Sequence, residues 1–422
     1  MKKVSVIGTG YVGLVSGACF EHLGHQVLCI DKDEKKIAAL KDGKCPIHEE
    51  GLEELLKKAD NLSFDTDISR ISESEIIFIC VGTPEKENGD ADLSYVYSVC
   101  EEIAGNLGEG QTVVAKSTIP VDSISKIKEI LRKSNVDFNF ASNPEFLAQG
   151  TAVKDFLEPD RVVIGSETEE GGKELEQLYQ NMKAPIVKTD VESAIMIKYA
   201  ANTFLATKVS FINSIARLCE KVGANVNDVA KGMGMDKRIG TRFLKAGIGY
   251  GGSCFTKDTK ALIKTASKNG LSLDILKEVN KTNEEQRKLV IEKLRRHLGD
   301  LTDKQISMFG LAFKPGTDDL RDAPSLFLIE DLNKKVKSLT AFDPVIKELN
   351  GFDGKVSVKK GAYEAVEGAD ALVFVTEHPE FNDLDFERIK SLVKGNVIID
   401  GRNFLDAEKL RSQGFIYEGI GV

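Results

Sequence analysis

The stretch VSVIGTGYVGLVSGACFEHLGHQVLCIDKD, residues 4–33, decides the fold of the first part of the chain. Two short apolar runs, 4–7 and 27–30, have the length and composition of buried strands. Between them, apolar residues recur at helical spacing until Gly24, a residue type that commonly ends helices. A strand, a helix and a second strand in this order predict a parallel βαβ unit and therefore an α/β fold.

Three glycines, Gly8, Gly10 and Gly13, form the pattern G-x-G-x-x-G between the first strand and the helix. In this context the first glycine makes a tight turn, the second lets the backbone approach a pyrophosphate, and the third packs the helix against the strand. Asp31 ends the second strand, where a carboxylate accepts hydrogen bonds from an adenosine ribose and disfavours the 2′-phosphate of NADP. We therefore expect NAD as the cofactor.

Further strand patterns alternate with helical stretches in the same part of the chain. They are EIIFICVGTP (75–84), TVVAKSTIP (112–120) and FNFASNPEF (138–146). Such alternation predicts a mostly parallel, doubly wound sheet, and ligands bind these sheets beyond the carboxyl ends of the strands. Thr83, Thr118 and Glu145 fall at those ends, so we expect them at one ligand-facing edge. The alternative for each is an ordinary turn residue.

Residues 191–222 form one helical pattern without Pro or Gly, and its first half is apolar on nearly every face, which predicts a buried helix. Lys198 and Asn202 lie in this half, four residues apart and therefore on one face. A buried lysine is costly unless it is paired or used, which makes both candidate functional residues; the alternative is a lysine that reaches the surface. A second helical stretch, 273–300, is expected to connect domains and to carry its charges on a solvated face.

From about residue 304 the strand–helix alternation restarts, which predicts a second Rossmann-like unit. This unit lacks G-x-G-x-x-G, and we expect it to bind a ligand other than a dinucleotide. Lys314, Arg321 and Arg402 lie at strand ends or in the following loops, either as phosphate contacts or as surface charges. The expected fold is α/β, with two Rossmann-like doubly wound parallel-sheet domains joined by a helical central region with a long connecting helix. The expected domains are residues 1–190, 191–300 and 301–422.

Composition excludes several classes of function. The net charge of −9 argues against nucleic acid or an anionic membrane as a partner. No apolar segment is long enough for a signal peptide or a membrane span, so a cytoplasmic location is expected. The seven cysteines include no C-x-x-C pair and the five histidines no H-x-x-x-H pattern, so we expect neither a disulfide framework nor a metal site.

Cys254 differs from other cysteines in its surroundings. Cys29 and Cys80 lie in apolar strand patterns and are expected in the core. Cys254 instead follows Gly-Gly-Ser in GYGGSCFTKD (249–258), four residues before Asp258. The glycines are expected to let the backbone and a substrate approach each other closely. A thiol in such a glycine-rich, polar segment is a candidate nucleophile.

Eight segments, in this order, resemble the UDP-glucose/GDP-mannose dehydrogenase family of nucleotide-sugar dehydrogenases over essentially the whole chain. They are GTGYVG (8–13), VGTP (81–84), STIP (117–120), NPEFLAQGTAVKDFLEPDRVVIG (143–165), IKYAANTFLA (197–206), FLKAGIGYGGSCFTKD (243–258), GLAFKPGTDDLRDAPS (310–325) and DGRN (400–403). The resemblance implies an N-terminal NAD domain, a helical middle that forms a homodimer, and a C-terminal domain that binds UDP.

The resemblance also implies a reaction. GYGGSC and FLKAG resemble the UDP-glucose branch best, which implies NAD-dependent twofold oxidation of UDP-glucose at C6 to UDP-glucuronate through a cysteine thiohemiacetal and thioester. GDP-mannose or a UDP-N-acetylhexosamine stays open as the substrate. A non-catalytic sensor of NAD or a sugar nucleotide is a further alternative, against which the intact set of candidate catalytic residues argues.

Individual roles follow from the resemblance. Cys254 would be the nucleophile, Lys198 and Asn202 would hold the oxyanion, Asp258 would act with a water as base, and Thr118 and Glu145 would position water, Glu145 also in thioester hydrolysis. The residues implied in cofactor binding are Gly8, Gly10, Tyr11, Val12, Gly13, Asp31, Lys36, Thr83, Thr118, Lys257 and Arg321. Those implied in substrate binding are Glu145, Phe146, Leu147, Lys198, Asn202, Arg238, Phe243, Lys245, Gly247, Tyr250, Gly251, Lys314 and Arg402, with Arg238 reaching the substrate of a neighbouring subunit.

The chain departs from the family pattern at two positions. Relatives usually have F-P-K-D after the cysteine, where this chain has Thr256 in place of proline, and many have an acid where Gln149 stands. Neither change removes an implied catalytic group. Both concern the shape of the local loop and the contacts to the cofactor.

Overall fold

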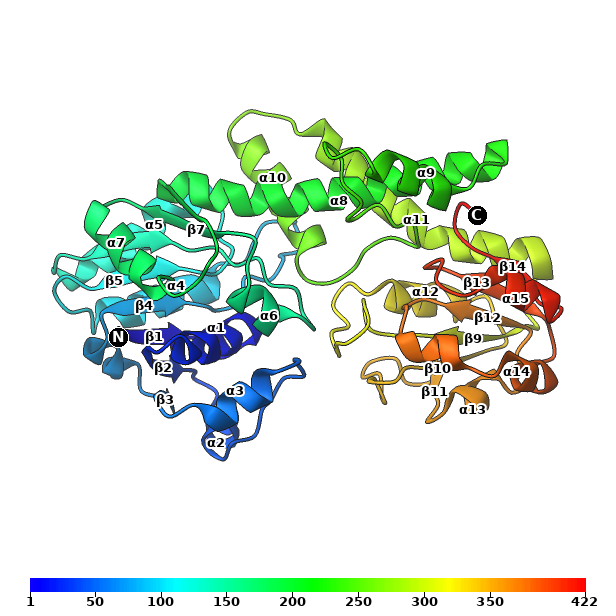
Figure 1. Cartoon of the computed structure of the whole chain (residues 1–422), viewed down its shortest axis with the longest axis horizontal. Coiled ribbons are helices and arrows are strands. Elements are labelled where there is room, and N and C mark those ends of the chain that lie inside the picture. The colour runs from blue at the N-terminus through cyan, green and yellow to red at the C-terminus, as the bar shows by residue number, and fades with distance from the viewer. The chain divides into compact units, whose positions relative to one another are not determined.

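The computed structural model describes all 422 residues, which form two compact units. Unit 1 comprises Met1–Ala201 and Lys260–Leu271, and unit 2 comprises Asn202–Thr259 and Ser272–Val422. Two of the three boundaries fall inside helices, α8 (Val191–Val222) and α10 (Phe255–Lys268), so each of these helices contributes residues to both units (Figure 1). The third boundary, at residues 271 and 272, follows α10. The division into three domains at residues 190 and 300 stays a prediction.

Unit 1 is built on a sheet of eight strands in the order β3-β2-β1-β4-β5-β6-β7-β8. The strands are β1 Lys3–Ile7, β2 Gln26–Ile30, β3 Leu62–Asp65, β4 Ile76–Ile79, β5 Thr112–Ala115, β6 Asn139–Ser142, β7 Val162–Ser166 and β8 Ile186–Thr189. All neighbours pair in parallel except β6 and β7, which are antiparallel. The first six strands therefore form the expected doubly wound sheet, whose order changes direction between β1 and β4.

The helices of unit 1 connect these strands as crossovers. They are α1 Tyr11–His22, α2 Glu34–Lys41, α3 Leu52–Lys58, α4 Ser94–Ala104, α5 Ile124–Leu131, α6 Ala152–Leu157 and α7 Glu169–Leu178. Helix α1 packs closely on the sheet because Gly17 has no side chain: a Cβ there would lie 2.4 Å from the sulfur of Cys29. Cys29 and Cys80 are both buried, as predicted for core residues, and burial raises the pKa of the Cys80 thiol to about 12. Neither is a candidate nucleophile.

Unit 2 contains a second sheet, of six strands, in the order β11-β10-β9-β12-β13-β14. The strands are β9 Gln305–Phe309, β10 Ser338–Phe342, β11 Ser357–Val358, β12 Ala371–Phe374, β13 Val397–Asp400 and β14 Ile416–Glu418, and the helices are α9 Val226–Gly234, α11 Asp274–Leu298, α12 Pro324–Leu332, α13 Ala362–Val366, α14 Phe386–Leu392 and α15 Ala407–Ser412. Every pair of neighbours is parallel. The predicted second Rossmann-like sheet is therefore confirmed (Figure 1).

The two sheets repeat each other at their first turn. Gly8 follows β1 with a φ of 97°, and Gly310 follows β9 with a φ of 90°. Each glycine donates its N–H to the last carbonyl of the second strand, at 2.7 Å and 2.9 Å. An aspartate comes directly after that second strand in both cases, Asp31 after β2 and Asp343 after β10. The second unit therefore retains the geometry of a dinucleotide-binding turn without its glycine pattern.

The carboxylate of Asp343 is buried, and its hydrogen-bond partners surround it. Its side chain is 0% exposed, and Oδ2 accepts hydrogen bonds from the N–H groups of Leu311 and Ala312 and lies 3.2 Å from Nε2 of His378. Oδ1 accepts from the N–H groups of the following turn, including that of Ile346. Burial raises the pKa of Asp343, but the hydrogen bonds from His378 and the backbone outweigh it and lower this pKa to about 2.

Helix α8 has the predicted bounds, but the expectation that its first half is buried on nearly every face is wrong. Met196 is 39% exposed and Phe204 is 64% exposed, and the exposed face continues with Phe211 and Leu218. The opposite face carries the buried residues, because a helix of this length has one face toward each unit's core and one away from it. No helix of the chain, α8 included, is long and apolar enough to span a membrane.

The expectation that the charged residues of helix α11 lie only on a solvated face is also wrong. Lys293 is 1% exposed, and its Nζ donates to Glu220 at 2.6 Å and to Glu418 at 2.8 Å. Arg287 is 9% exposed and forms an ion pair with Asp322. Both cations are buried because carboxylates from distant segments meet them, which offsets the cost of desolvation.

We expect Asp343→Asn to lower the free energy of unfolding by about 2 kcal/mol at pH 7, because a pKa shift of one unit corresponds to about 1.4 kcal/mol. The pKa of Asp343 is near 3.8 in the unfolded chain and about 2 in the folded one. The carboxylate therefore stabilises the fold fully at pH values above 3.8, and this stabilisation is lost as the pH falls through about 2. Roughly half of the difference between wild type and variant should therefore be gone at pH 3. Urea unfolding at pH 5 and pH 3 measures it, with the exposed Asp383→Asn as control, and a pH-independent difference contradicts the interpretation.

Candidate active site

The turn after β1 has the shape of a pyrophosphate cradle. A Cβ on Gly13 would lie 1.8 Å from the carbonyl oxygen of Gly8, so α1 reaches the strand only with glycine at this position. By contrast, no protein atom lies within 4 Å of the place that a Cβ on Gly10 would occupy. Gly10 is the N-cap of α1, no side chain caps this helix end, and its first turn holds no acid. The backbone N–H groups of Tyr11 and Val12 therefore open an anion site that fits a dinucleotide.

Asp31 is held as an ionised carboxylate next to this cradle. Oδ2 accepts hydrogen bonds at 2.8 Å from both the N–H and the hydroxyl of Thr9, and Nζ of Lys36 lies 3.2 Å away. Burial raises the pKa of Asp31, but these hydrogen bonds and that of the Asp33 N–H outweigh it and bring the pKa below its usual range. A fixed carboxylate here can accept hydrogen bonds from a ribose, and Lys36 balances its charge.

The residues predicted at one ligand-facing edge of the sheet do follow neighbouring strands. Strands β4, β5 and β6 are neighbours in the sheet, so the residues that follow them, Thr83, Thr118 and Glu145, come from adjacent strand ends. The Thr83 hydroxyl donates to the carbonyl oxygen of Thr118 at 3.0 Å and ties two of these loops together. The side chains of Thr83 and Glu145 are both buried.

Glu145 and Lys198 form a buried ion pair within unit 1. Nζ of Lys198 donates to the backbone carbonyl of Glu145 at 2.6 Å and to its Oε1 at 2.8 Å, and the two side chains are 4% and 9% exposed. The N–H of Leu147 donates to Oε2 at 2.6 Å. Burial raises the pKa of Glu145, but the charge and hydrogen bond of Lys198 and the Leu147 N–H outweigh it and lower the pKa below its usual range. Lys198 is therefore paired rather than directed to the surface, and Glu145 is an anion.

Phe146 lies between two cations. The guanidinium of Arg161 stacks on its ring at 3.6 Å from the centroid, and Nζ of Lys198 lies 5.3 Å from the same centroid. Such cation–π contacts fix the ring and lower the cost of burying the lysine charge. Tyr11 also anchors the segment after Glu145, because its hydroxyl accepts a hydrogen bond at 2.9 Å from the N–H of Gly150.

Lys116 is a residue of this cluster that sequence reasoning missed. It follows β5 and is 4% exposed, and its Nζ donates to Oδ1 of Asn143 at 2.9 Å. Burial lowers the pKa of Lys116 to about 8, against smaller opposing effects of nearby groups that include Glu145. The available signal was a lysine directly after a strand with the composition of a buried one, comparable to the lysine inside an apolar helix that identified Lys198.

In unit 2, Cys254 lies at the start of α10. It is exposed, and its carbonyl accepts the N–H of Asp258 at 2.8 Å, the first bond of the helix. The side chain of a residue in this place faces the N–H groups of the first turn, which favour negative charge. Arg321 adds a positive charge within electrostatic reach, since Asp319 and, more weakly, Cys254 raise its pKa. The sequence pattern named Cys254 but not the helix end that favours its thiolate form.

Asp258 lies one turn after Cys254 and is 1% exposed. Its Oδ2 accepts a hydrogen bond at 2.6 Å from Nδ2 of Asn202, and its Oδ1 accepts one at 2.5 Å from Nζ of Lys257. Each carboxylate oxygen has a further lone pair, so a water can still donate to it. The structure thus joins Asn202 to Asp258, a contact that the sequence did not predict, while Lys257, implied in cofactor binding, here contacts Asp258.

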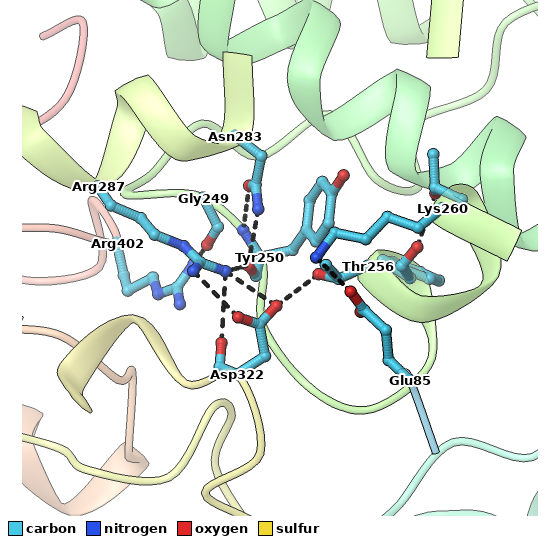
Figure 2. A network of polar contacts seen from close by, with 11 residues as sticks. Glu85, Gly249, Tyr250, Thr256, Lys260, Asn283, Arg287, Asp322 and Arg402 are labelled. Atoms are coloured by element: carbon cyan, nitrogen blue, oxygen red, sulfur yellow. Dashed lines mark hydrogen bonds and ion pairs between the residues drawn. The ribbon is translucent and has the colours of Figure 1, made fainter. Parts of the chain in front are cut away.

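The glycine-rich segment before Cys254 is fixed by unit 2 itself (Figure 2). A Cβ on Gly249 would lie 2.6 Å from Oδ1 of Asn283, and one on Gly251 would lie 2.3 Å from the carbonyl oxygen of Asp322. On Gly252, whose φ is 85°, a Cβ would lie 2.8 Å from the ring of Phe313. Packing within unit 2 therefore requires glycine at these three positions, because protein atoms fill the space that a Cβ would occupy, and the close approach of a substrate to this segment stays a prediction.

Several implied substrate contacts have protein partners in unit 2. Gly247 donates its N–H to Asn213 and accepts from Gln286, and the N–H and carbonyl of Tyr250 both bond Asn283. Arg402 donates through Nη1 to the carbonyl of Gly249 and through Nε to that of Val375, each at 2.8 Å. Other implied substrate contacts lie at or near the surface of the unit: Arg238, which pairs with Asp236, and Phe243, Lys245 and Lys314. Arg321, implied in cofactor binding, is also exposed there and pairs with Asp319.

Three sequence models of one family match successive parts of the chain. Residues 2–183 match the NAD binding domain, residues 192–285 the central domain and residues 307–407 the UDP binding domain of the UDP-glucose/GDP-mannose dehydrogenase family. The chain belongs to this family.

Curated members of the UDP-glucose/GDP-mannose dehydrogenase family match over their full length. UDP-glucose 6-dehydrogenase TuaD of Bacillus subtilis (strain 168) is 46% identical over 100% of this chain and 93% of its own length. The UDP-glucose 6-dehydrogenase of Rhizobium meliloti (strain 1021) is 44% identical over 99% of both chains. A solved UDP-glucose dehydrogenase from Pyrobaculum islandicum superposes with a TM-score of 0.94 at 34% identity, covering 100% of this chain and 98% of that one.

Thr256, one of the two departures from the family pattern, fits the structure without distortion. It is the second residue of α10, and proline is tolerated in the first turn because its missing N–H would have no intrahelical partner there. Threonine at this place keeps the helix and adds a hydroxyl, which donates to Oδ2 of Asp322 at 2.5 Å.

We expect Asp31→Ala to shrink the preference for NAD over NADP. Repulsion between a carboxylate and a 2′-phosphate in contact amounts to a few kcal/mol, and about 1.4 kcal/mol is tenfold in affinity. The substitution also releases Lys36, which can then pair with the 2′-phosphate. Fluorescence titration of both cofactors measures the ratio. The double variant Asp31→Ala, Lys36→Ala should lose the gain in NADP affinity, and equal affinities in the wild type contradict the assignment of Asp31.

Proposed function

We propose that this protein is a UDP-glucose 6-dehydrogenase that uses NAD to oxidise UDP-glucose twice at C6, to UDP-glucuronate. One observation carries the proposal. An exposed cysteine starts a helix, one turn before a buried aspartate that is bonded to Asn202, in a chain whose full-length relatives are UDP-glucose 6-dehydrogenases. A sensor of NAD or of a sugar nucleotide would need binding residues but not this set.

Sequence similarity supports UDP-glucose over the other sugar nucleotides. Eight curated relatives with 42–46% identity are all UDP-glucose 6-dehydrogenases. A solved UDP-D-ManNAc dehydrogenase from Pyrococcus horikoshii is 29% identical with a TM-score of 0.89. A GDP-mannose dehydrogenase from Pseudomonas aeruginosa is 32% identical with a TM-score of 0.55.

The reaction proceeds in three stages, and NAD supplies the acceptor for both hydrides. In the first stage the C6 alcohol loses a hydride and its hydroxyl proton, which gives an aldehyde. The thiolate of Cys254 adds to this aldehyde and forms a thiohemiacetal. In the second stage the thiohemiacetal loses a hydride and a proton and becomes a thioester. In the third stage water attacks the thioester, which releases the carboxylate and returns the cysteine.

Lys198 and Asn202, one turn apart on α8, stabilise the oxygen anion that develops at C6. Both are donors that the protein already holds in place, Lys198 through Glu145 and Asn202 through Asp258. Such preorganised donors act without further reorganisation, and loss of one typically costs about 2.7–4 kcal/mol of transition-state stabilisation. Asp258 accepts the hydroxyl proton through a water, using a lone pair that Asn202 and Lys257 leave available.

Glu145 activates the water that hydrolyses the thioester, with Thr118 next to it at the strand ends. Its lowered pKa keeps the carboxyl ionised at neutral pH, so it can accept a proton from water. The NAD-binding role falls to Gly8, Gly10, Gly13, Asp31 and the strand ends of unit 1. We assign the UDP group to the sheet at the end of the chain, residues 301–422, because residues 307–407 match the UDP binding domain of the family. Asp343 is sealed inside the fold there, so the ribose would have to be held by groups other than this carboxylate.

We propose further that the chain forms a homodimer through α8. Phe204, Phe211, Leu218 and Val222 recur at spacings of seven, seven and four residues, and they are 64%, 49%, 57% and 66% exposed. A stripe of large apolar side chains at this spacing on a 32-residue helix is typical of a helix-packing interface. Exposed apolar residues around the next helix, Val229 among them, widen the surface.

Phe211→Glu should convert the dimer to a monomer, because it places a charge in the middle of the apolar stripe. Light scattering at micromolar concentration measures the mass. Leu271→Glu, at an apolar residue that is 65% exposed but lies outside α8, is the matched control and should leave the dimer intact. A wild-type monomer contradicts the proposed assembly.

The proposed chemistry predicts two NADH for each UDP-glucose, with no free aldehyde trapped by hydroxylamine, because Cys254 retains the intermediate. Cys254→Ala should abolish formation of UDP-glucuronate while UDP-glucose binding changes little, since Cys254 is exposed and the substitution removes a single sulfur atom. Absorbance of NADH and chromatography of the products measure both. One NADH for each sugar, or substantial acid production by Cys254→Ala, contradicts the mechanism.

A second variant separates hydrolysis from oxidation. Glu145→Gln removes the proton acceptor but keeps an oxygen for Lys198, so a sugar adduct should accumulate on Cys254, visible in the intact mass. A variant that turns over at the wild-type rate would exclude Glu145 as the hydrolytic base.

A further inference from the structure

The segment that leads into α10 is held by side chains of one face of α11 (Figure 2). Oδ1 of Asn283 accepts the N–H of Tyr250 at 2.8 Å, and its Nδ2 donates to the Tyr250 carbonyl at 3.1 Å. One turn further along α11, Nη2 of Arg287 donates to the same carbonyl at 3.0 Å. Both polar groups of the Tyr250 backbone are therefore fixed by a helix whose position is set by the core of unit 2.

Arg287 also binds a carboxylate, in a paired geometry. Its Nη1 and Nη2 donate to Oδ1 and Oδ2 of Asp322, each at 3.0 Å. Two parallel charge-assisted bonds of this kind are stronger and more directional than a single ion pair. The Arg287 side chain is 10% exposed, so water competes little for it. Asp322 itself adopts a φ of 51°, a conformation that a residue with a side chain adopts only when surrounding contacts hold it.

The same carboxylate reaches α10. The hydroxyl of Thr256 donates to Oδ2 of Asp322 at 2.5 Å, and Thr256 is two residues after Cys254. On the other side of Cys254, the backbone of the 321–322 segment lies directly against the glycines. The N–H of Gly252 donates to the Arg321 carbonyl at 2.9 Å, and a Cβ on Gly251 would lie 2.3 Å from the Asp322 carbonyl.

We propose that Asp322 is a positioning residue for Cys254, acting through Thr256. The carboxylate joins α11 to the first turn of α10, and the N–H groups of that turn are the ones that stabilise a thiolate at Cys254. Without the Thr256 hydrogen bond, the first turn keeps the contact of Phe255 with Tyr250 and the bond of Asp258 to Asn202 but loses its link to Asp322 and Arg287, so its N-terminal end can shift relative to α11. The thiolate then loses aligned donors, and the sulfur loses its fixed direction of attack.

Asp322 is distinct from the groups to which the proposed function gives chemical roles. Its carboxylate bonds Arg287 and Thr256, and the effect that we assign to it is on the geometry of the helix end alone. The turnover part of the proposal rests on the proposed function, whereas the reactivity of the thiol does not.

The test compares Thr256→Val, which removes only the hydroxyl, with Thr256→Ser, which keeps it. Thr265→Val, the same change two and a half turns further along α10, is the matched control. Each variant is treated with iodoacetamide, and peptide mapping gives the alkylation rate of Cys254 separately from that of the half-exposed Cys45. The turnover number, the KM for UDP-glucose and the thermal midpoint are measured on the same preparations.

We expect Thr256→Val to slow alkylation of Cys254 and to lower kcat by about 10- to 100-fold, the usual effect of slight misplacement of a reacting group, with KM and thermal midpoint nearly unchanged. Thr256→Ser and Thr265→Val should behave as the wild type. Asp322→Asn should have an effect at least as large, and adding Thr256→Val to it should cause no further loss, because the two residues act through one contact.

Three outcomes overturn the proposal. The first is an unchanged alkylation rate and kcat in Thr256→Val, and the second is additive loss in the double variant. The third is a fall in thermal midpoint that accounts for the lost activity in both Thr256→Val and Thr256→Ser, because the role would then be structural. A wild type whose Cys254 is alkylated normally but that does not oxidise UDP-glucose refutes the proposed function, and the alkylation rates of the variants then decide the positioning role alone.

Discussion

The start of α10 is the constraint on which unit 2 depends. A helix N-terminus stabilises a thiolate only while the N–H groups of its first turn stay aligned with the sulfur. The segment that enters this turn is fixed by backbone hydrogen bonds to α11 and to the loop around Asp322, at distances that leave no room for a Cβ on Gly249 or Gly251. The glycine-rich composition before Cys254 is thus a packing requirement of the protein itself. A cysteine at the end of a flexible loop would have the same sequence neighbours without the fixed direction.

The buried charges of unit 1 obey a related rule. Lys198 is buried in contact with the carboxylate of Glu145, and this ion pair keeps Glu145 ionised in spite of its burial. Lys116 is buried too, but its Nζ donates to the amide oxygen of Asn143 instead of a carboxylate. Desolvation lowers the pKa of Lys116 to about 8. The comparison shows that the ion pair outweighs burial in setting the pKa of Glu145, whereas burial has the larger effect on the pKa of Lys116. An anionic Glu145 can take a proton from water but cannot donate one, which fits a base in hydrolysis and excludes a general acid at neutral pH.

The sequence predicts those features of the structure that depend on residues close together in the chain. The strands at 4–7 and 27–30 and the helix at 191–222 were predicted because their periodicity lies within a few residues, and Lys198 stood out because its own helix is apolar. The burial of Lys293 and Arg287 was not predicted, because their partners lie 73, 125 and 35 residues away. The packing beside the glycines was not predicted for the same reason, because the atoms next to Gly249 and Gly251 belong to Asn283 and Asp322, which are distant in the sequence. Pattern reasoning identified Cys254 and Asp258, but the helix end and the α11 contacts that orient them arise only on folding.

The two Rossmann-like sheets show how one feature of a fold can serve binding in one place and stability in the other. Asp31 and Asp343 follow equivalent strands and accept hydrogen bonds from equivalent turns. Asp31 has a side chain 13% exposed and shares its charge with Lys36, so a ribose can still reach it. Asp343 is 0% exposed because Leu311, Ala312 and His378 close over it, and its carboxylate serves only to fix the turn. The turn is held in the same way in both sheets, so at this point the sheets differ in the side chains that cover the aspartate rather than in their topology. A ligand of the second sheet finds no exposed carboxylate here, which leaves the other strand ends, such as the end of β13 that Arg402 follows.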